Sequence, residues 1–151
     1  MSSPLKARLE LDMQNALRAG DKARLSVVRM ALAGVKQREV DTRRPSDDAA
    51  VLSVIERMIK QGRDSLAQYR AGNREDLAAK EEAEIAVLET YLPEPLSEDA
   101  LEALIREVVE ATGATSLKDM GKVMAEIKAR ASGRVDMASV NPRVRAALGG
   151  D

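Results

Sequence analysis

Apolar residues recur at three- and four-residue spacing along most of this chain, which is the spacing that brings side chains to one side of an α-helix. The stripe within residues 22–41 is clear and consists of Leu25, Val28, Leu32 and Val35. A longer stripe runs from Val51 to Tyr69 and predicts the longest helix of the chain. No segment shows the sustained alternation of apolar and polar residues that is typical of a β-strand. The pattern therefore predicts an all-α protein.

Capping residues and helix breakers divide this pattern into separate helices. A side-chain oxygen that can accept the first free backbone N–H groups precedes most of them, and the predicted starts are Ser3, Asp21, Ser46, Asn73, Ser97 and Ser116. Two of these starts have an aspartate three residues later and resemble a capping box, which gives the pairs Asn73 with Asp76 and Ser116 with Asp119. The predicted ends are Gly20, about Asp41, Gly72, Pro93, Gly113 and Ser132-Gly133.

The last helix depends on how Pro142 is read. A helix that began at Asp136 would contain this proline in its interior, where proline removes a backbone hydrogen bond. Asn141 as the cap, with Pro142 at the first helical position, is the better fit. We therefore predict a short final helix that starts at Pro142.

The best domain boundary is the segment Pro93-Glu94-Pro95, because two prolines stop a helix and Ser97 can start the next one. We predict an N-terminal helical domain of about four helices at residues 1–93 and a small three-helix C-terminal domain at residues 96–151.

The composition excludes several kinds of chemistry. The sequence has no His, Cys, Trp or Phe, so it lacks an imidazole base, a thiol nucleophile and the usual ligands of zinc. We expect no metal, no cofactor and no catalytic residue. No apolar run approaches the length of a membrane span, and nothing indicates export. No membrane association is expected, and a cytoplasmic location is the default prediction.

Charge is segregated along the chain although the net charge is only −1. Residues 1–46 carry ten basic and five acidic residues, a net charge of +5. Residues 47–94 carry six basic and eleven acidic residues, a net charge of −5. Residues 112–150 carry seven basic and three acidic residues, a net charge of +4. With only two aromatic residues to stack on bases, any contact with a nucleic acid would be mostly ionic.

The segment from Thr115 to Asp136 combines a capped helix, a glycine and a cluster of cations. At 100° per residue its apolar side chains fall on one side, while Lys118 and Lys122 lie opposite and face water or a partner. Gly121 costs about 1 kcal/mol relative to alanine inside a helix. Core packing is the favoured explanation for this glycine, and close approach to an anionic ligand is the alternative.

The basic C-terminal residues are the candidate nucleic-acid ligands. Arg143 and Arg145 would lie at the start of the final helix, where backbone amides can receive a phosphate oxygen. The alternative is that these cations only solubilise an exposed helix face. The full candidate set is Lys118, Gly121, Lys122, Lys128, Arg130, Arg134, Arg143 and Arg145.

A second cationic strip is predicted in the N-terminal domain, where Arg29 and Lys36 lie seven residues apart and share a helical flank. The alternative is an ordinary surface helix with an ion pair between Lys36 and Glu39. The acidic run of Glu81, Glu82, Glu84 and Glu89 is interpreted as a solvated helix face rather than as an acid–base or metal site.

Four separated segments resemble the GatB/YqeY family, which comprises small stand-alone proteins and the C-terminal tail of the B subunit of the tRNA-dependent amidotransferase. They are residues 24–41 (RLSVVRMALAGVKQREVD), 59–69 (IKQGRDSLAQY), 72–93 (GNREDLAAKEEAEIAVLETYLP) and 116–124 (SLKDMGKVM). The resemblance covers nearly the whole chain, and its specificity lies in the order and spacing of these segments. Two departures are expected: Gly62 in place of a basic residue, and Pro142 near the end.

The resemblance implies an all-helical N-terminal domain joined to a three-helix tail, and an association with glutamine-dependent amidation of misacylated tRNA. It also implies that the tail helps to hold tRNA, with Lys118, Gly121, Lys122 and Arg134 at the positions most suspected of RNA contact. In the large B subunit the catalytic portion lies outside the shared tail.

Three functional hypotheses follow. The first is a tRNA-binding accessory module without catalysis of its own. The second is a helical interaction module for an aminoacyl-tRNA synthetase or an amidotransferase subunit. The third is the activity that the family label implies, a carbon–nitrogen ligase with glutamine as amido-N-donor, which the absence of Cys, His and a nucleotide-binding loop disfavours.

Overall fold

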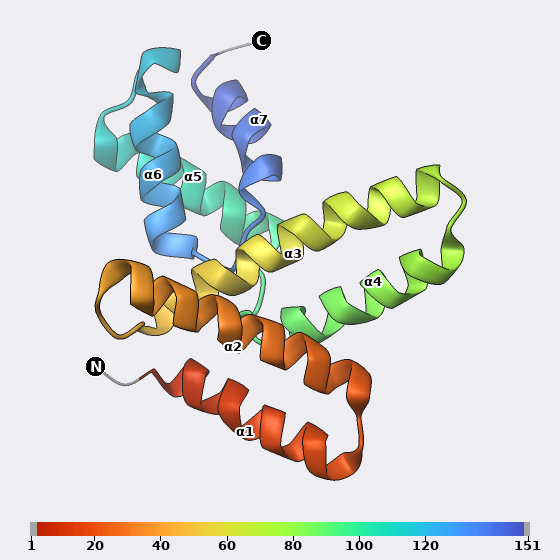
Figure 1. Ribbon diagram of the computed structural model, residues 1–151. Helices are drawn as coiled ribbons and strands as arrows, with labels where there is room; N and C mark the ends of the chain where they lie inside the picture. The colour runs from red at the N-terminus through yellow and green to blue at the C-terminus, as the bar shows by residue number, and fades with distance from the viewer. Residues whose placement is uncertain (1–2, 150–151) are drawn as a thin grey trace. The chain divides into compact units, whose positions relative to one another are not determined.

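The computed structural model describes residues 3–149, which form seven α-helices and one short 3₁₀-helix (Figure 1). Their bounds are α1 Pro4–Ala19, α2 Lys22–Thr42, α3 Asp48–Ala71, α4 Glu75–Glu89, α5 Glu98–Thr112, η1 Leu117–Asp119, α6 Met120–Ala131 and α7 Met137–Ala147. No strand occurs among the described residues. The all-α prediction is confirmed, and α3 is the longest helix, with 24 residues.

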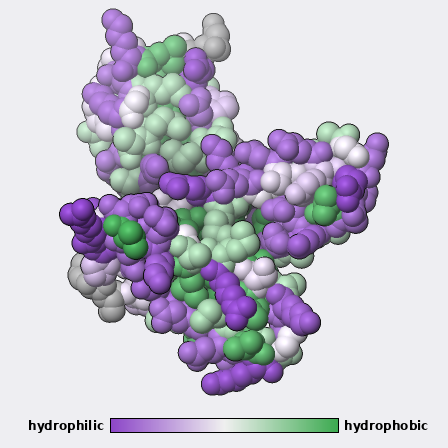
Figure 2. Space-filling model, in the orientation of Figure 1, coloured by the Kyte–Doolittle hydropathy of each residue, from purple (hydrophilic) through white to green (hydrophobic). Residues whose placement is uncertain are grey.

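The chain divides into two compact units, Met1–Leu92 and Pro93–Asp151. The N-terminal unit contains α1 to α4, and the C-terminal unit contains α5 to α7 with η1. Figure 2 shows hydrophilic residues along the edges of both units, with separate hydrophobic patches on the N-terminal unit and a pale area of weakly hydrophobic residues on the C-terminal unit.

The core of the N-terminal unit is built from the predicted stripes of α2 and α3. The side chains that are fully enclosed are aliphatic and come from three helices, namely Leu9, Val28, Ala31, Val35, Val51 and Ile55. In Figure 1, α1 runs beside α2, and α3 and α4 form a hairpin. Burial of such side chains stabilises a helix bundle by about 1.5–3 kcal/mol each.

Two glycines allow close helix contacts in this unit. A Cβ added at Gly34 would lie 2.8 Å from Cγ1 of Val54, where α2 crosses α3. A Cβ at Gly62 would lie 3.0 Å from both Oε1 of Glu81 and Cγ1 of Ile85, where α3 packs on α4. Both positions therefore favour the residue without a side chain.

The core of the C-terminal unit is smaller and is formed by all three of its helices. Its fully enclosed side chains are Val108, Val123, Ile127, Val140 and Val144. The helices α5 and α7 each pack on α6. This places the apolar side of α6 inward, as its helical phase predicts.

Most predicted helix boundaries are confirmed. Ser3 caps α1 and Gly20 ends it in the left-handed conformation, with φ of 69°. Asp21 caps α2, and Ser97 caps α5. The capping box of Ser116 and Asp119 is present, although it opens the 3₁₀-helix η1 before α6 begins.

Two predicted caps are wrong. Asp47, not Ser46, accepts the hydrogen bond from the backbone N–H of Ala50 at the start of α3. Ser46 is buried instead and donates its backbone N–H to Glu39. At the start of α4 the N-cap residue is Arg74 rather than Asn73, and its side chain makes no capping hydrogen bond.

The predicted start of the last helix is also wrong. Asp136 caps α7 by accepting from the N–H of Ala138, and Pro142 lies inside the helix. An early start brings Val140 and Val144, one turn apart, into the core, where both are fully buried. The proline removes the N–H that would bond the carbonyl of Ala138, four residues earlier, and its ring crowds that carbonyl, at a cost of about 3 kcal/mol. Apolar burial outweighs this cost.

Candidate nucleic-acid interface

The candidate interface begins at a hydrogen-bonded turn in front of α6. The carboxylate of Asp119 accepts the backbone N–H of Thr115 at 2.9 Å and that of Ser116 at 3.3 Å. These donors and nearby Lys122 lower the pKa of Asp119, with the Thr115 amide as the main cause. The ionised carboxylate therefore holds the turn from which Lys118 projects.

Helix α6 separates its apolar residues from its lysines. Val123, Ile127 and Ala131 are buried, whereas Lys122 of α6 and Lys118 of the preceding 3₁₀-helix η1 are exposed. The predicted division of this helix into a core side and an outer side is confirmed.

Gly121 does not serve core packing. It is exposed, and a Cβ added there would find no atom within 4 Å. The favoured explanation from the sequence is therefore wrong, because the residue lies on the outer side of α6, one position after the helix begins. Exposed Ala125 and Ala129 continue the same side at four-residue spacing. Small side chains thus leave the helix backbone accessible between the lysines.

Some cations of η1 and α6 already form ion pairs, and others do not. Lys122 lies 3.5 Å from Asp119, and Arg130 lies 2.9 Å from Glu126. Within residues 3–149, Lys118 and Lys128 form no ion pair or side-chain hydrogen bond. Exposed ion pairs are worth about 0–1 kcal/mol, so Lys122 can exchange its partner for a phosphate. Lys118, Lys122 and Lys128 surround the small-residue side of α6 and form what we call the lysine face.

The remaining predicted arginines have other surroundings. The Nε of Arg134 donates to the backbone carbonyl of Glu94 at 2.8 Å, within the C-terminal unit. Arg143 is half-buried and pairs with Glu98 of α5. Because α7 starts at Met137, Arg143 and Arg145 lie in its second half and not at its N-terminal amides. The predicted phosphate site at the start of that helix is therefore wrong. Arg143 and Arg145 are two positions apart, so they lie on different sides of α7.

Arg29 and Lys36 are both exposed on α2, in the N-terminal unit. The ion pair considered between Lys36 and Glu39 does not form. Glu39 instead lies 3.1 Å from Nζ of Lys6 and accepts the N–H of Ser46 at 2.8 Å. The Ser46 amide and Lys6 lower the pKa of Glu39, in that order of importance. Glu39 thus fixes the α2–α3 connection.

Glu82 and Glu89 of the acidic run on α4 are exposed and form ion pairs with arginines of α3. Glu82 pairs with Arg70, and Glu89 lies 3.3 Å from Arg63. Burial, reinforced by the charge of Glu84, raises the pKa of Glu81 beside Gly62. Among residues 3–149 no group of three or more metal-ligating side chains occurs, and no helix is long and apolar enough to cross a membrane.

The family model described as Yqey-like protein matches residues 6–148, which is nearly the whole chain. The chain belongs to this family. The match includes all the described helices except the first two residues of α1, so both units of this Yqey-like protein carry the resemblance.

Relatives of this Yqey-like protein include three fungal proteins named "Altered inheritance of mitochondria protein 41, mitochondrial". The protein of Pyrenophora tritici-repentis is 31% identical over 147 residues, covering 94% of this chain and 80% of the relative. The Kluyveromyces lactis protein is 30% identical, covering 93% and 74% respectively. The Vanderwaltozyma polyspora protein is 29% identical, covering 74% and 64%. The chain thus spans just under two thirds of that last relative.

The cytoplasmic location predicted from the sequence is wrong on this comparison, because the relatives are named as mitochondrial proteins. Composition and core pattern do not encode a compartment. Receptors recognise targeting segments, which take no part in the fold.

Proposed function

We propose that this Yqey-like protein is a tRNA-binding accessory module related to the glutamine-dependent tRNA amidotransferase, without catalysis of its own. The lysine face of α6 carries the proposal. It presents Lys118, Lys122 and Lys128 around an exposed glycine where no side chain obstructs approach. The resemblance of SLKDMGKVM to the tRNA-holding tail of the amidotransferase B subunit suggests the class of ligand.

A surface of this kind would bind the RNA backbone rather than the bases. Lysines supply point charges to phosphates, and folded RNA is recognised largely through phosphates, 2′-hydroxyls and shape. The small-residue side of α6 would allow a sugar–phosphate backbone to approach closely between the lysines. Three phosphate contacts predict that log affinity falls with log salt at a slope of about −2 to −3.

The chemistry of amidation would belong to another subunit. Nucleophilic glutamine hydrolysis requires an activated group such as a cysteine thiolate, and the sequence contains no Cys and no His. We expect purified protein to release no ammonia from glutamine. Release at a rate that scales with protein concentration would favour the carbon–nitrogen ligase that the family label implies.

The test compares tRNA binding of the full chain at two salt concentrations. In one variant Lys118, Lys122 and Lys128 are replaced by alanine. In the control, the exposed lysines Lys22, Lys60 and Lys80 are replaced. Both variants lose three charges, but only the first loses the lysine face.

We expect the first variant to bind about tenfold or more weakly near 0.1 M salt and to lose most of the salt slope, while the control resembles wild type. Arg134 is left unchanged because its contact with Glu94 is structural. Equal binding by the two variants, or no binding by wild type, would contradict the proposal.

A further inference from the structure

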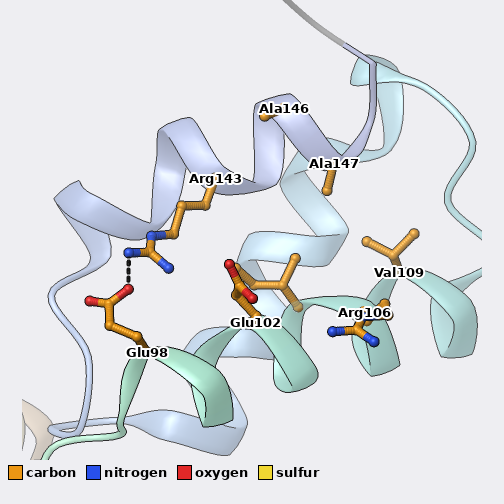
Figure 3. Close-up of a pocket in the computed structure, with 8 residues that line it drawn as sticks. Glu98, Glu102, Arg106, Val109, Arg143, Ala146 and Ala147 are labelled. Atoms are coloured by element: carbon orange, nitrogen blue, oxygen red, sulfur yellow. Dashed lines mark hydrogen bonds and ion pairs between the residues drawn. The ribbon is translucent and has the colours of Figure 1, made fainter.

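A groove opens between α5 and α7, which each pack on α6 (Figure 3). Its volume is about 550 Å³, within the range of about 300–1,000 Å³ typical of ligand sites. Ile105 and Val109 line it from α5, and Ala146 and Ala147 from α7. The two alanines end at Cβ, so the last turn of α7 leaves this space unfilled. The groove combines these apolar residues with charged ones at its rim, and no described residue of the C-terminal unit fills it.

The length of the groove indicates what kind of occupant it fits. Its lining residues on α5 run from Glu98 to Val109, eleven positions apart. At 1.5 Å per residue this is about 17 Å, or three turns of helix. An amphipathic helix laid beside α5 would contact the groove over this length through apolar residues at three- and four-residue spacing.

The charges at the groove specify the partner further. Glu98 is already paired with Arg143 at one end (Figure 3). Glu102 and Arg106, one turn apart on the rim, form no ion pair or side-chain hydrogen bond within residues 3–149. They are available to a partner that offers a cation to Glu102 and a carboxylate to Arg106. Complementary rim charges fix the register of such a contact.

We propose that the α5–α7 groove docks an amphipathic helix of a partner protein. The helix places two or three apolar side chains over Ile105, Val109 and Ala147, a Lys or Arg against Glu102, and an Asp or Glu against Arg106. This goes beyond RNA binding, because the groove shares no residue with the lysine face. A protein and an RNA can therefore engage the C-terminal unit through separate surfaces.

The probe is a displayed library of helical peptides of about 14 residues, or four turns, selected on the full-length protein. Selected peptides are then measured against two variants of α7. Ala147→Trp fills the groove, and Ala138→Trp places the same side chain on another side of the helix. Circular dichroism establishes that both variants remain helical.

We expect the selected peptides to share apolar residues at three- and four-residue spacing with a cation and a carboxylate one turn apart. Ala147→Trp should weaken their binding by about tenfold or more, while Ala138→Trp leaves it unchanged. Glu102→Lys should also weaken binding, and reversing the matching peptide cation should restore it.

Three results would overturn the proposal. One is selected peptides that bind wild type and Ala147→Trp equally. Another is binding that neither Glu102→Lys nor Arg106→Glu changes. The third is self-association of the wild-type protein in light scattering that Ala147→Trp abolishes, which would assign the groove to a second copy of the chain. Loss of tRNA binding in the lysine variants bears on none of these results, so the two proposals fail separately.

Discussion

Gly62 on α3 and Gly121 on α6 are the same residue inside a helix, yet their surroundings are opposite. At Gly62 an added Cβ would press on Glu81 and Ile85 of α4 at 3.0 Å. At Gly121 it would meet nothing within 4 Å. Each glycine lowers the stability of its helix relative to alanine, and the cost is smaller at Gly121, in the first turn of α6, than at Gly62 in the interior of α3. The first cost is offset by close packing of α3 on α4, and no described residue of the C-terminal unit packs against Gly121 to offset the second.

The difference teaches that a helical glycine without a packing role is the more informative one. A glycine at a helix crossing serves the fold and needs no other explanation. The exposed Gly121 beside Lys118 and Lys122 lowers helix stability, and no packing contact in the described structure compensates for this loss. A ligand that approaches the helix backbone at this position, such as the proposed RNA, would explain the glycine.

Replacing Gly62 by leucine is expected to give the largest effect. The side chain would have to displace Ile85 and the buried part of Glu81, so the N-terminal unit should lose about 2–3 kcal/mol of stability. Tyr69 and Tyr91 both belong to this unit, and the sequence has no Trp. Tyrosine fluorescence during urea unfolding therefore reports this unit alone.

Gly121→Leu is the matched control, because the same substitution enters open space. It should change the free energy of unfolding of the C-terminal unit by less than about 0.5 kcal/mol. Hydrogen exchange of the α6 amides measures this free energy. Equal losses in the two variants would remove the contrast between the glycines.

Tyr91 fixes the end of the α4 segment to α1 and gives an intermediate effect. Its hydroxyl donates to Asp12, and Arg8 lies 4.6 Å from its ring centroid. Burial first, and then the hydrogen bond to Asp12, raise the pKa of Tyr91 to about 12. The unfolded pKa is about 10. The raised folded value contributes stability that is complete below pH 10 and is lost as the pH rises through 12.

We expect this loss to reach about 2 kcal/mol between pH 10 and 12. Comparison with Tyr91→Phe isolates it, because the variant lacks the titrating hydroxyl while other residues titrate as before. Urea unfolding at both pH values measures the stability, and absorbance near 295 nm follows the ionisation. A stability difference between the two proteins that does not change with pH would show that the hydroxyl ionises equally in folded and unfolded chains.

Local signals make the helices predictable from the sequence. The contacts between helices are not predictable in this way. Ser3, Asp21 and Ser97 cap helices because each acts on backbone groups within three residues. The local cost of Pro142 argues against a helix that starts at Asp136, and only the burial of Val140 in the folded unit explains why the helix starts there. Gly62 and Gly121 look alike in sequence because their difference lies entirely in which helix comes near.

The candidate surfaces divide in the same way. The helical phase of α6 is sufficient to place Lys122 on its outer side, whereas Lys118 lies in the 3₁₀-helix η1, which precedes α6. The α5–α7 groove could not be predicted, because it requires Ala147 on one helix to face Val109 on another. The ion pair of Arg143 with Glu98 joins residues 45 positions apart, and no sequence spacing indicates it.

Gly121→Ala should give a small gain in stability and the sharpest test of the contrast. The added methyl group enters open space. Alanine has the highest helix propensity, and among the common residues only proline has a lower one than glycine. The position lies in the first turn of α6, so we expect a gain near the lower end of the usual range, about 0.5 kcal/mol. Hydrogen exchange of the α6 amides in wild type and variant measures it.

The same substitution should weaken tRNA binding if the RNA backbone lies against Gly121, and Gly121→Leu should weaken it more. Ala125→Leu, one turn further along the same side, should act in the same direction, whereas Ala138→Leu on α7 should have no effect. A stability gain without any change in tRNA affinity across this series would leave the exposed glycine without a role in the proposed interface. Binding would then rest on the charges of the lysine face alone.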